Sequence, residues 1–279
     1  PHQCFRRQRQ MCIRDRHVVG FLVTILAILG SVIFGAIWGL IPGYLQAKRG
    51  SHIVITTIMF NFIAAALMVY LLVNVIIEPG QMSPETRDFA SGVGLVQIHI
   101  LAKYLGLEMA MSPLNLSFIV ALTVSVGFWF LVWRTKFGYE VRSLGHSETA
   151  AIYAGIKVSS TIIIVMAISG GLAGLVAINE LLGVHNKLLL GFTAGYGFTG
   201  IAVALMGRNH PFGIFLASLL FGALYQGGTE LDFEFSSITR EMVLLIQGLI
   251  ILFSGALAYM LNPLVERIYI KYYGNYNNA

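Results

Sequence analysis

Three long runs without a charged residue constrain this chain more than any other feature of its sequence. They extend from Val18 to Ile41, from Ile53 to Ile77 and from Ala110 to Trp133. Each run reaches the roughly 20 residues that a helix needs to cross about 30 Å of hydrocarbon. A segment inside lipid must satisfy its own backbone hydrogen bonds, so these runs predict helices. The alternating pattern of a membrane β-barrel strand is absent from the sequence.

The overall composition agrees with a membrane protein. Hydrophobic residues make up 57% of the chain and charged residues 11%, with a mean hydropathy of +0.77, whereas a soluble domain carries about 25% charged residues. The isoelectric point of about 9.3 does not indicate a nucleic-acid partner, because the basic residues gather at the ends of the apolar runs. The two cysteines, Cys4 and Cys12, predict no disulfide framework and no metal site.

We therefore predict an all-α fold, a polytopic transmembrane helical bundle with about seven spans in this chain. Glycines interrupt the fifth span, which can be broken or re-entrant where protein covers its backbone. The predicted spans are residues 18–41, 53–77, 113–133, 158–179, 188–207, 211–228 and 238–261.

Basic residues are distributed unevenly between the two sets of loops that these spans create. One set contains Lys48, Arg49, Arg134, Lys136, Arg142, Lys157, Arg208, Arg267 and Lys271. The other contains Arg87, Lys103, Lys187 and Arg240, together with acidic residues such as Glu85, Asp88 and Glu230. The positive-inside rule assigns the first set to the cytoplasm. We expect a multi-pass protein of the cell (inner) membrane with an external loop at 78–110, a cytoplasmic loop at 134–157 and a cytoplasmic C-terminal tail at 271–279.

The first residues of the chain conflict with this orientation. Residues 1–16 are rich in arginine but would precede a span that starts outside the cell, and they lack the apolar core of a signal peptide. The stretch Met11–Arg16 (MCIRDR) resembles translated sequencing-adapter sequence. We expect residues 1–16 to be a non-native leader, the transmembrane domain to cover 17–270, and further helices to precede it in the natural protein, so that this chain is truncated at its N-terminus.

The loop from Arg134 to Lys157 is the segment whose sequence indicates most about function. Ser147 is a good N-cap for a short helix that ends near Ala154, and Gly155 suits its C-terminal stop. Small side chains mark one face of this helix, at Ala150, Ala151 and Ala154. A short surface helix of this kind can dock into a groove on a partner, or it can simply lie in the lipid interface.

The same loop, FGYEVRSLGHSETAAIYAGI, resembles the coupling loop of one class of ABC permeases, which import branched-chain amino acids, simple sugars and nucleosides. That loop reads approximately FGYELRAVGxNPxAARYAGI. Residues 35–65, 166–183 and 191–213 resemble the nucleoside branch of the class, except that Ile53 stands where glutamate is expected. The resemblance covers roughly residues 18–270.

This resemblance implies a permease subunit that moves a small polar solute, above all a nucleoside, into the cytoplasm. Its implied partners are a separate ABC ATPase, a second homologous permease, an extracytoplasmic substrate-binding protein and the lipid bilayer. The residues implied to couple to the ATPase are Gly138, Glu140, Arg142, Gly145, Ser147, Glu148, Ala150, Ala151, Tyr153, Ala154 and Gly155. A simple-sugar permease, a branched-chain amino-acid permease and a secondary transporter remain the alternatives.

Several missing motifs agree with a transport subunit that is not an enzyme. The phosphate-binding motif G-x-x-x-x-G-K-[ST] does not occur, so ATP hydrolysis is expected on another polypeptide. The predicted helix interiors contain no Asp, Glu, Lys or Arg, whereas ion-coupled carriers use buried ionisable groups. Residues 195–200 match G-x-G-x-x-G, but no strand precedes them, so we expect no cofactor there. The scattered histidines predict no metal site.

Neutral polar and aromatic side chains are the candidates for contact with an uncharged solute. They also serve as helix-packing residues in membranes. The candidate substrate-path residues are Thr57, Phe60, Asn61, Phe192, Tyr196 and Phe198. Glycines recur at four-residue spacing at Gly35, Gly39 and Gly43, at Gly170 and Gly174, and at Gly191 and Gly195, which predicts close helix contacts.

Overall fold

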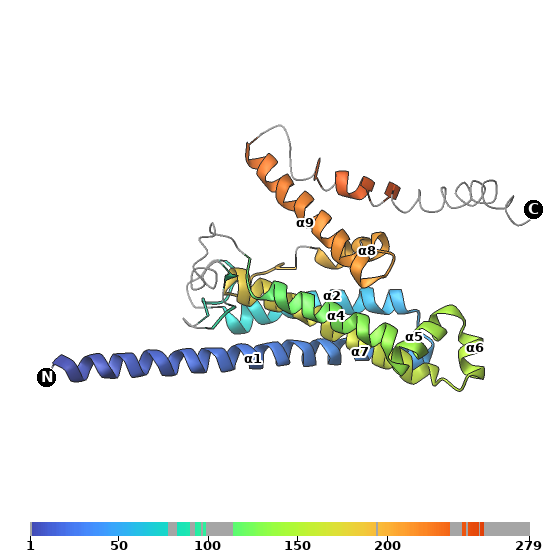
Figure 1. Ribbon diagram of the computed structural model, residues 1–279, viewed down its shortest axis with the longest axis horizontal. Coiled ribbons are helices and arrows are strands. Elements are labelled where there is room, and N and C mark those ends of the chain that lie inside the picture. Colours follow the sequence, from blue (N-terminus) through green and yellow to red (C-terminus); the bar gives the residue numbers. More distant parts are fainter. Residues whose placement is uncertain are drawn as a thin grey trace, which may run out of the picture. The chain divides into compact units, whose positions relative to one another are not determined.

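The computed structural model describes residues 2–77, 83–89, 93–95, 97–98, 114–193 and 195–234, with 242–243, 245–250 and 252–253. The described residues form helices and irregular segments, with isolated bridges but no named strand. The chain divides into two compact units, residues 1–194 and 195–279. Figure 1 draws the first unit in blue to yellow and the second in orange to red.

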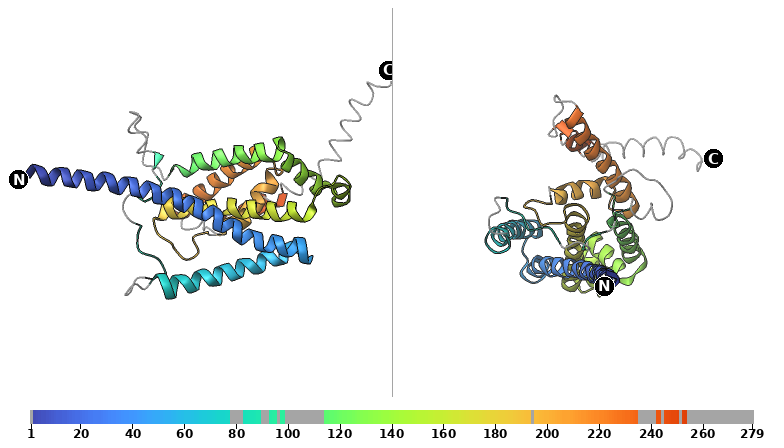
Figure 2. Two further views of the ribbon diagram at one scale, coloured as in Figure 1. Left: turned by 90° about the horizontal axis from the view of Figure 1, so that it is seen from below. Right: turned by 90° about the vertical axis from the view of Figure 1, so that its left-hand side faces the viewer.

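The first unit contains four long helices that run back and forth along one direction (Figures 1 and 2). These are α1 (His2–Arg49), α2 (Ile53–Leu71), α4 (Ser117–Arg134) and α7 (Val158–Ala177). Helix α2 continues into the π-helical segment η1 (Leu72–Ile76), and α7 continues into η2 (Ile178–His185). Two short helices, α5 (Lys136–His146) and α6 (Glu148–Tyr153), lie at the end where α1 terminates.

Five helices of the described part are long and apolar enough to cross a membrane. They contain the segments Leu22–Arg49, Ile53–Ile76, Ser117–Arg134, Val158–His185 and Pro211–Leu231. Many of their large apolar side chains are exposed, including Phe34, Phe62 and Val75, as expected where lipid and not water surrounds a helix. The prediction of an all-α membrane bundle is confirmed. The seventh predicted span, 238–261, and most of the loop at 78–110 fall outside the described residues.

The fifth predicted span is broken. Residues 186–193 form turns and irregular backbone, and only α8 (Tyr196–Met206) is helical. Gly191 and Gly195 have φ values of +72° and +80°, which glycine tolerates and an α-helix excludes. A Cβ on either glycine would meet nothing within 4 Å. The prediction of close helix contact was therefore wrong for these two glycines, which form turns.

The other spaced glycines make the predicted close contact, between α1 and α7. A Cβ on Gly35 would collide with the carbonyl oxygen of Gly170, and a Cβ on Gly170 would collide with that of Gly35. One on Gly39 would lie 2.6 Å from the carbonyl oxygen of Met166. The two backbones therefore touch along this crossing, which is the type of helix contact that small residues permit in lipid.

The second unit is a pair of packed helices. Helix α8 contacts α9 (Pro211–Glu234) through Val203, Ala217 and Phe221. The turn between them uses left-handed backbone at Arg208 and Asn209, with φ of 54° and 55°. This hairpin accounts for the predicted span at 211–228, which the structure extends.

Candidate functional site

A cavity of about 550 Å³ lies between α1, α2 and α7, and residues 192–193 also line it. Its volume falls within the range of roughly 300–1,000 Å³ that small-molecule sites occupy. Helix α1 contributes Trp38 and α7 contributes Ser169. Helix α2 contributes Thr57, Phe60 and Asn61. All of these residues belong to the first unit.

Four of the six predicted substrate-path residues line this one cavity: Thr57, Phe60, Asn61 and Phe192. Three of them lie on α2, where Thr57 and Asn61 are four positions apart and therefore share a face of the helix. Tyr196 and Phe198 belong to the second unit and are not among the lining residues.

Trp38 is a lining residue that the sequence analysis missed. It precedes Gly39 and stands four positions before Pro42, and all three line the cavity from α1. This i, i+4 spacing beside a glycine-rich stretch is the signal that could have identified it.

The lining favours an uncharged solute with an aromatic part. The rings of Trp38 and Phe60 meet edge to face, and Phe192 adds a third ring to the wall. The Thr57 hydroxyl donates to the carbonyl oxygen of Ile53 over 2.9 Å, which leaves its oxygen able to accept a hydrogen bond. Among the described residues no hydrogen bond engages the Asn61 side chain, and no ionisable side chain lines the cavity.

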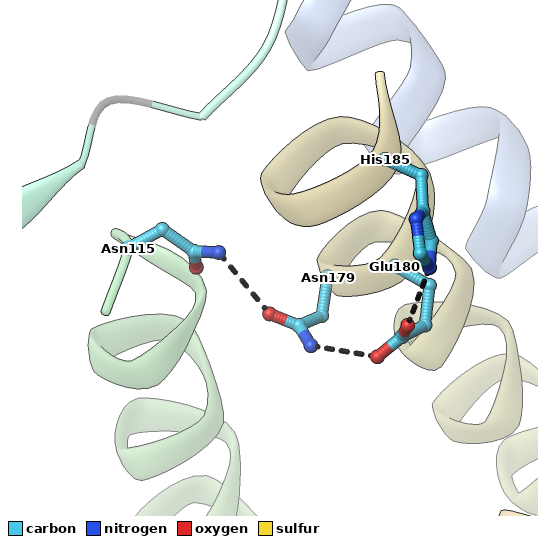
Figure 3. Close-up of polar contacts among 4 residues, drawn as sticks. All are labelled: Asn115, Asn179, Glu180 and His185. Atoms are coloured by element: carbon cyan, nitrogen blue, oxygen red, sulfur yellow. Dashed lines mark hydrogen bonds and ion pairs between the residues drawn. The ribbon is translucent and has the colours of Figure 1, made fainter. Parts of the chain in front are cut away.

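A polar cluster that is buried at Asn115 and Glu180 lies on η2 and at the start of α4 (Figure 3). The Asn115 side-chain amide donates to Asn179 Oδ1 over 3.3 Å, and the Asn179 amide donates to Glu180 Oε1 over 3.0 Å. His185 Nε2 lies 3.7 Å from Glu180 Oε2. Ser117 also donates to Asn179 Oδ1, over 2.6 Å. Asn115 and Glu180 are 4% and 8% exposed, so this cluster joins the start of α4 to η2 inside the protein.

Glu180 corrects the expectation that the spans contain no acidic residue. The predicted fourth span ended at residue 179, but the helix continues through π turns to His185 and includes Glu180. Its carboxylate is tolerated because Asn179 donates to it and His185 lies beside it. Sequence hydropathy missed this continuation because residues 180–187 mix polar and apolar types.

The loop predicted at 134–157 consists of two helices. Thr135 caps α5, and its hydroxyl accepts a hydrogen bond from the Gly138 amide over 3.1 Å. Ser147 caps α6 as predicted, accepting from the Ala150 amide over 3.3 Å, and Gly155 ends the turn with φ of +78°. The predicted coupling residues from Gly138 to Gly155 thus lie on α5, α6 and their caps.

The two sides of α6 differ sharply in exposure. The Ala151 side chain is 1% exposed, whereas Tyr153 is 93% exposed and Ile152 is 57% exposed. Of the three alanines predicted to form a small-residue face, Ala151 is buried, whereas Ala150 and Ala154 are exposed. Two positions along an α-helix differ by about 200° of rotation. Ala151 and Tyr153 therefore lie on opposite sides of α6.

Comparison with known proteins identifies a family. The family model described as "Branched-chain amino acid transport system / permease component" matches residues 8–255. A guanosine ABC transporter permease protein, NupP of Bacillus subtilis, is 35% identical over 87% of this chain and 68% of its own length. A glucose permease, TsgB13 of Haloferax volcanii, is 30% identical over 82% of this chain and 60% of its own length. A nucleoside permease, NupB of Lactococcus lactis, is 31% identical over 83% and 63%.

The chain therefore spans about two thirds or less of the length of these three relatives. No solved structure matches it.

Proposed function

Because the chain belongs to the family of branched-chain amino acid transport system permease components, we propose that it forms part of the solute path of an ABC importer for nucleosides. Family membership makes it a membrane transport subunit and not an enzyme. The choice of nucleosides depends on the cavity between α1, α2 and α7 and on the relatives that carry guanosine or nucleosides in their names.

The cavity supports a nucleoside on three grounds. Trp38, Phe60 and Phe192 offer rings for contact with a flat base. Thr57 and Asn61 offer hydrogen bonds for base or sugar groups. The described lining carries no charge, which suits a neutral solute and disfavours an amino acid, whose ammonium and carboxylate groups would need partners.

The partners and the orientation belong to the same proposal. The chain pairs with a second, homologous permease above a separate ATPase, and an extracytoplasmic binding protein delivers the solute. Helices α5 and α6 face the cytoplasm, with Ile152 and Tyr153 as the exposed groups that contact the ATPase. The permease domain covers 17–270, and the C-terminal tail is cytoplasmic.

A reconstitution experiment tests this function. The chain, co-expressed with the ATPase, permease and binding-protein subunits of its own transport system, is placed in proteoliposomes, and ATP-dependent uptake of labelled guanosine, adenosine, ribose, glucose and leucine is measured. We expect saturable uptake of the nucleosides, with little uptake of the other three. Preferred uptake of glucose or ribose would assign the chain to sugars. If uptake does not need ATP and an ionophore abolishes it, the chain would be part of a secondary carrier and not of an ABC importer.

A further inference from the structure

A second cavity, of about 900 Å³, lies at the end of the first unit where α1 terminates and where α2 and α7 begin. The turn Gly50–His52, part of α6 and the first turn of α7 line it. Because α1, α2 and α7 contain membrane spans, their common end lies at the depth of the lipid headgroups.

Two positive helix ends meet in this cavity. Helix α2 begins after His52 and α7 begins after Lys157, and neither cap residue makes a side-chain hydrogen bond to its helix. The first amide groups of a helix have no partner within it, and the macrodipole places partial positive charge at this end. Two separate helices therefore present unused N–H donors to one space, since Ile53, Val158 and Ser159 all line it.

The side chains in the cavity add positive charge and an unused hydroxyl. Lys48, Lys157 and His52 line it together with one acidic residue, Glu148. The hydroxyl oxygen of Ser51, another lining residue, is buried and has no hydrogen-bond partner within the described part of the chain. A buried hydroxyl without a partner costs free energy, and rotation of the Ser51 side chain about χ1 would bring it to an anion in the cavity and relieve that cost.

We propose that this cavity binds the phosphate group of an anionic phospholipid. Phosphate oxygens accept hydrogen bonds from helix N-termini and from hydroxyl groups, and lysines neutralise their charge. Basic pockets between membrane helices bind lipid headgroups in this way. The acyl chains would extend along the exposed apolar surface of α2, where Val54 and Ile58 are 52% and 44% exposed. This site is separate from the cavity proposed for the solute.

Native mass spectrometry of the full chain in detergent tests the proposal with a matched pair of variants. The pocket variant K48Q/K157Q removes two lysines that line the cavity. The control variant R49Q/K136Q removes two positive charges from exposed residues at the same end of the unit, outside the lining. Since a basic residue at a membrane surface contributes about 1 kcal/mol to binding of anionic lipid, the pocket variant should bind phosphatidylglycerol roughly 30-fold more weakly. The control should stay close to the wild-type protein.

A third variant separates loss of the site from loss of the fold. Ile53→Glu places a carboxylate at the first residue of α2, inside the cavity. A negative charge there favours the helix N-terminus, so phosphatidylglycerol binding should disappear while the thermal unfolding midpoint does not fall. Equal binding of phosphatidylglycerol and phosphatidylcholine, or equal losses in the pocket and control variants, would overturn the proposal. If inorganic phosphate at millimolar concentration displaces phosphatidylglycerol completely, the ligand of this site would be a soluble phosphate and not a lipid.

Discussion

The indole of Trp38 and the phenyl ring of Phe60 meet edge to face, with centroids 5.7 Å apart and planes at 71°. One ring belongs to α1 and the other to α2, and both line the cavity proposed for the solute. Such a pair contributes about 0.5–1.5 kcal/mol beyond the burial of its area. The contact therefore helps to hold α1 and α2 together beside the cavity proposed for the solute.

Asn61→Leu should weaken nucleoside transport without unfolding the protein. Asn61 lines the cavity, and among the described residues no hydrogen bond holds its side chain. The loss of one hydrogen bond to the solute predicts a KM about 3- to 10-fold higher. Asn74→Leu is the control, because Asn74 lies on the same continuous helix, outside the lining, and donates to the carbonyl oxygen of Tyr70. Equal KM values in the two variants would remove Asn61 from the solute path.

Gly170→Ala should destabilise the first unit by about 1–3 kcal/mol or more, because the added methyl group meets the backbone of α1 at Gly35. Gly30→Ala, on α1 itself, is the control. A Cβ there meets nothing within 4 Å, so this variant should be neutral or up to about 1 kcal/mol more stable. Reversible unfolding in detergent by SDS titration measures both. Similar free energies of unfolding would contradict the backbone contact.

Tyr153→Ala should abolish coupling to the ATPase while leaving the fold intact. Tyr153 is 93% exposed, so its loss removes no internal packing, whereas a truncated aromatic anchor at an interface costs about 2 kcal/mol or more. We expect ATP-driven uptake and ATPase co-purification to fall at least about 10-fold. Tyr139→Ala, which removes an exposed tyrosine from α5, should retain uptake. Normal uptake by the Tyr153 variant would exclude this face of α6 as the contact.

Ala151→Arg should act on folding instead of docking. The side chain of Ala151 is 1% exposed, so an arginine there must either bury a charge or displace α6. We expect a lower thermal unfolding midpoint and little folded protein. An arginine variant that unfolds at the wild-type temperature would show that α6 can rotate in its place.

Glu180→Leu should destabilise the first unit by about 1–3 kcal/mol, because the Asn179 amide loses its acceptor inside the protein. Glu180→Gln keeps an oxygen at that place and should cost less. Glu230→Leu is the control, since Glu230 accepts one side-chain amide hydrogen bond from Gln226 on an exposed helix face. If Glu180→Leu and Glu230→Leu lower the free energy of unfolding equally, the polar cluster around Glu180 has no structural role.

The ion pair of Lys187 with Glu85 predicts a pH effect outside the spans. The Nζ atom lies 2.9 Å from Glu85 Oε2, and the hydrogen bond with Glu85 raises the pKa of Lys187 above its usual 10.5. A raised pKa stabilises the folded protein fully below the unfolded value, and the effect is lost as the pH rises through the folded value. The unfolding midpoint of Lys187→Gln should lie slightly below wild type at neutral pH, and the gap should close as the pH rises through the raised pKa of Lys187. A gap that does not narrow as the pH rises would contradict the ion pair.

The sequence predicted those features of the fold that depend on local composition and residue spacing. The charge-free runs marked the long helices, Ser147 marked the cap of α6, and the spaced glycines marked the crossing of α1 and α7. These features follow from helix geometry and from the cost of polar groups in lipid.

The features that were missed depend on contacts between distant segments. Asn179 donates to Glu180 and is itself held by Asn115, which comes from a distant segment at the start of α4. No local sequence pattern indicates this link to Asn115. Helix α5 contains Gly138 and Gly145, which lower helix propensity, yet Gly138 is required where α5 folds back on α4. Ala151 is buried by tertiary packing that the sequence of α6 alone does not reveal.

The glycine crossing of α1 and α7 has a consequence for how this protein can vary. No residue is smaller than glycine, so an added atom at Gly35 cannot be offset by trimming Gly170, which faces it. At an ordinary helix interface, a larger residue on one helix can be offset by a smaller residue on the other. Such paired substitutions are not possible at this crossing. Any larger residue at this crossing can therefore only push the two helices apart.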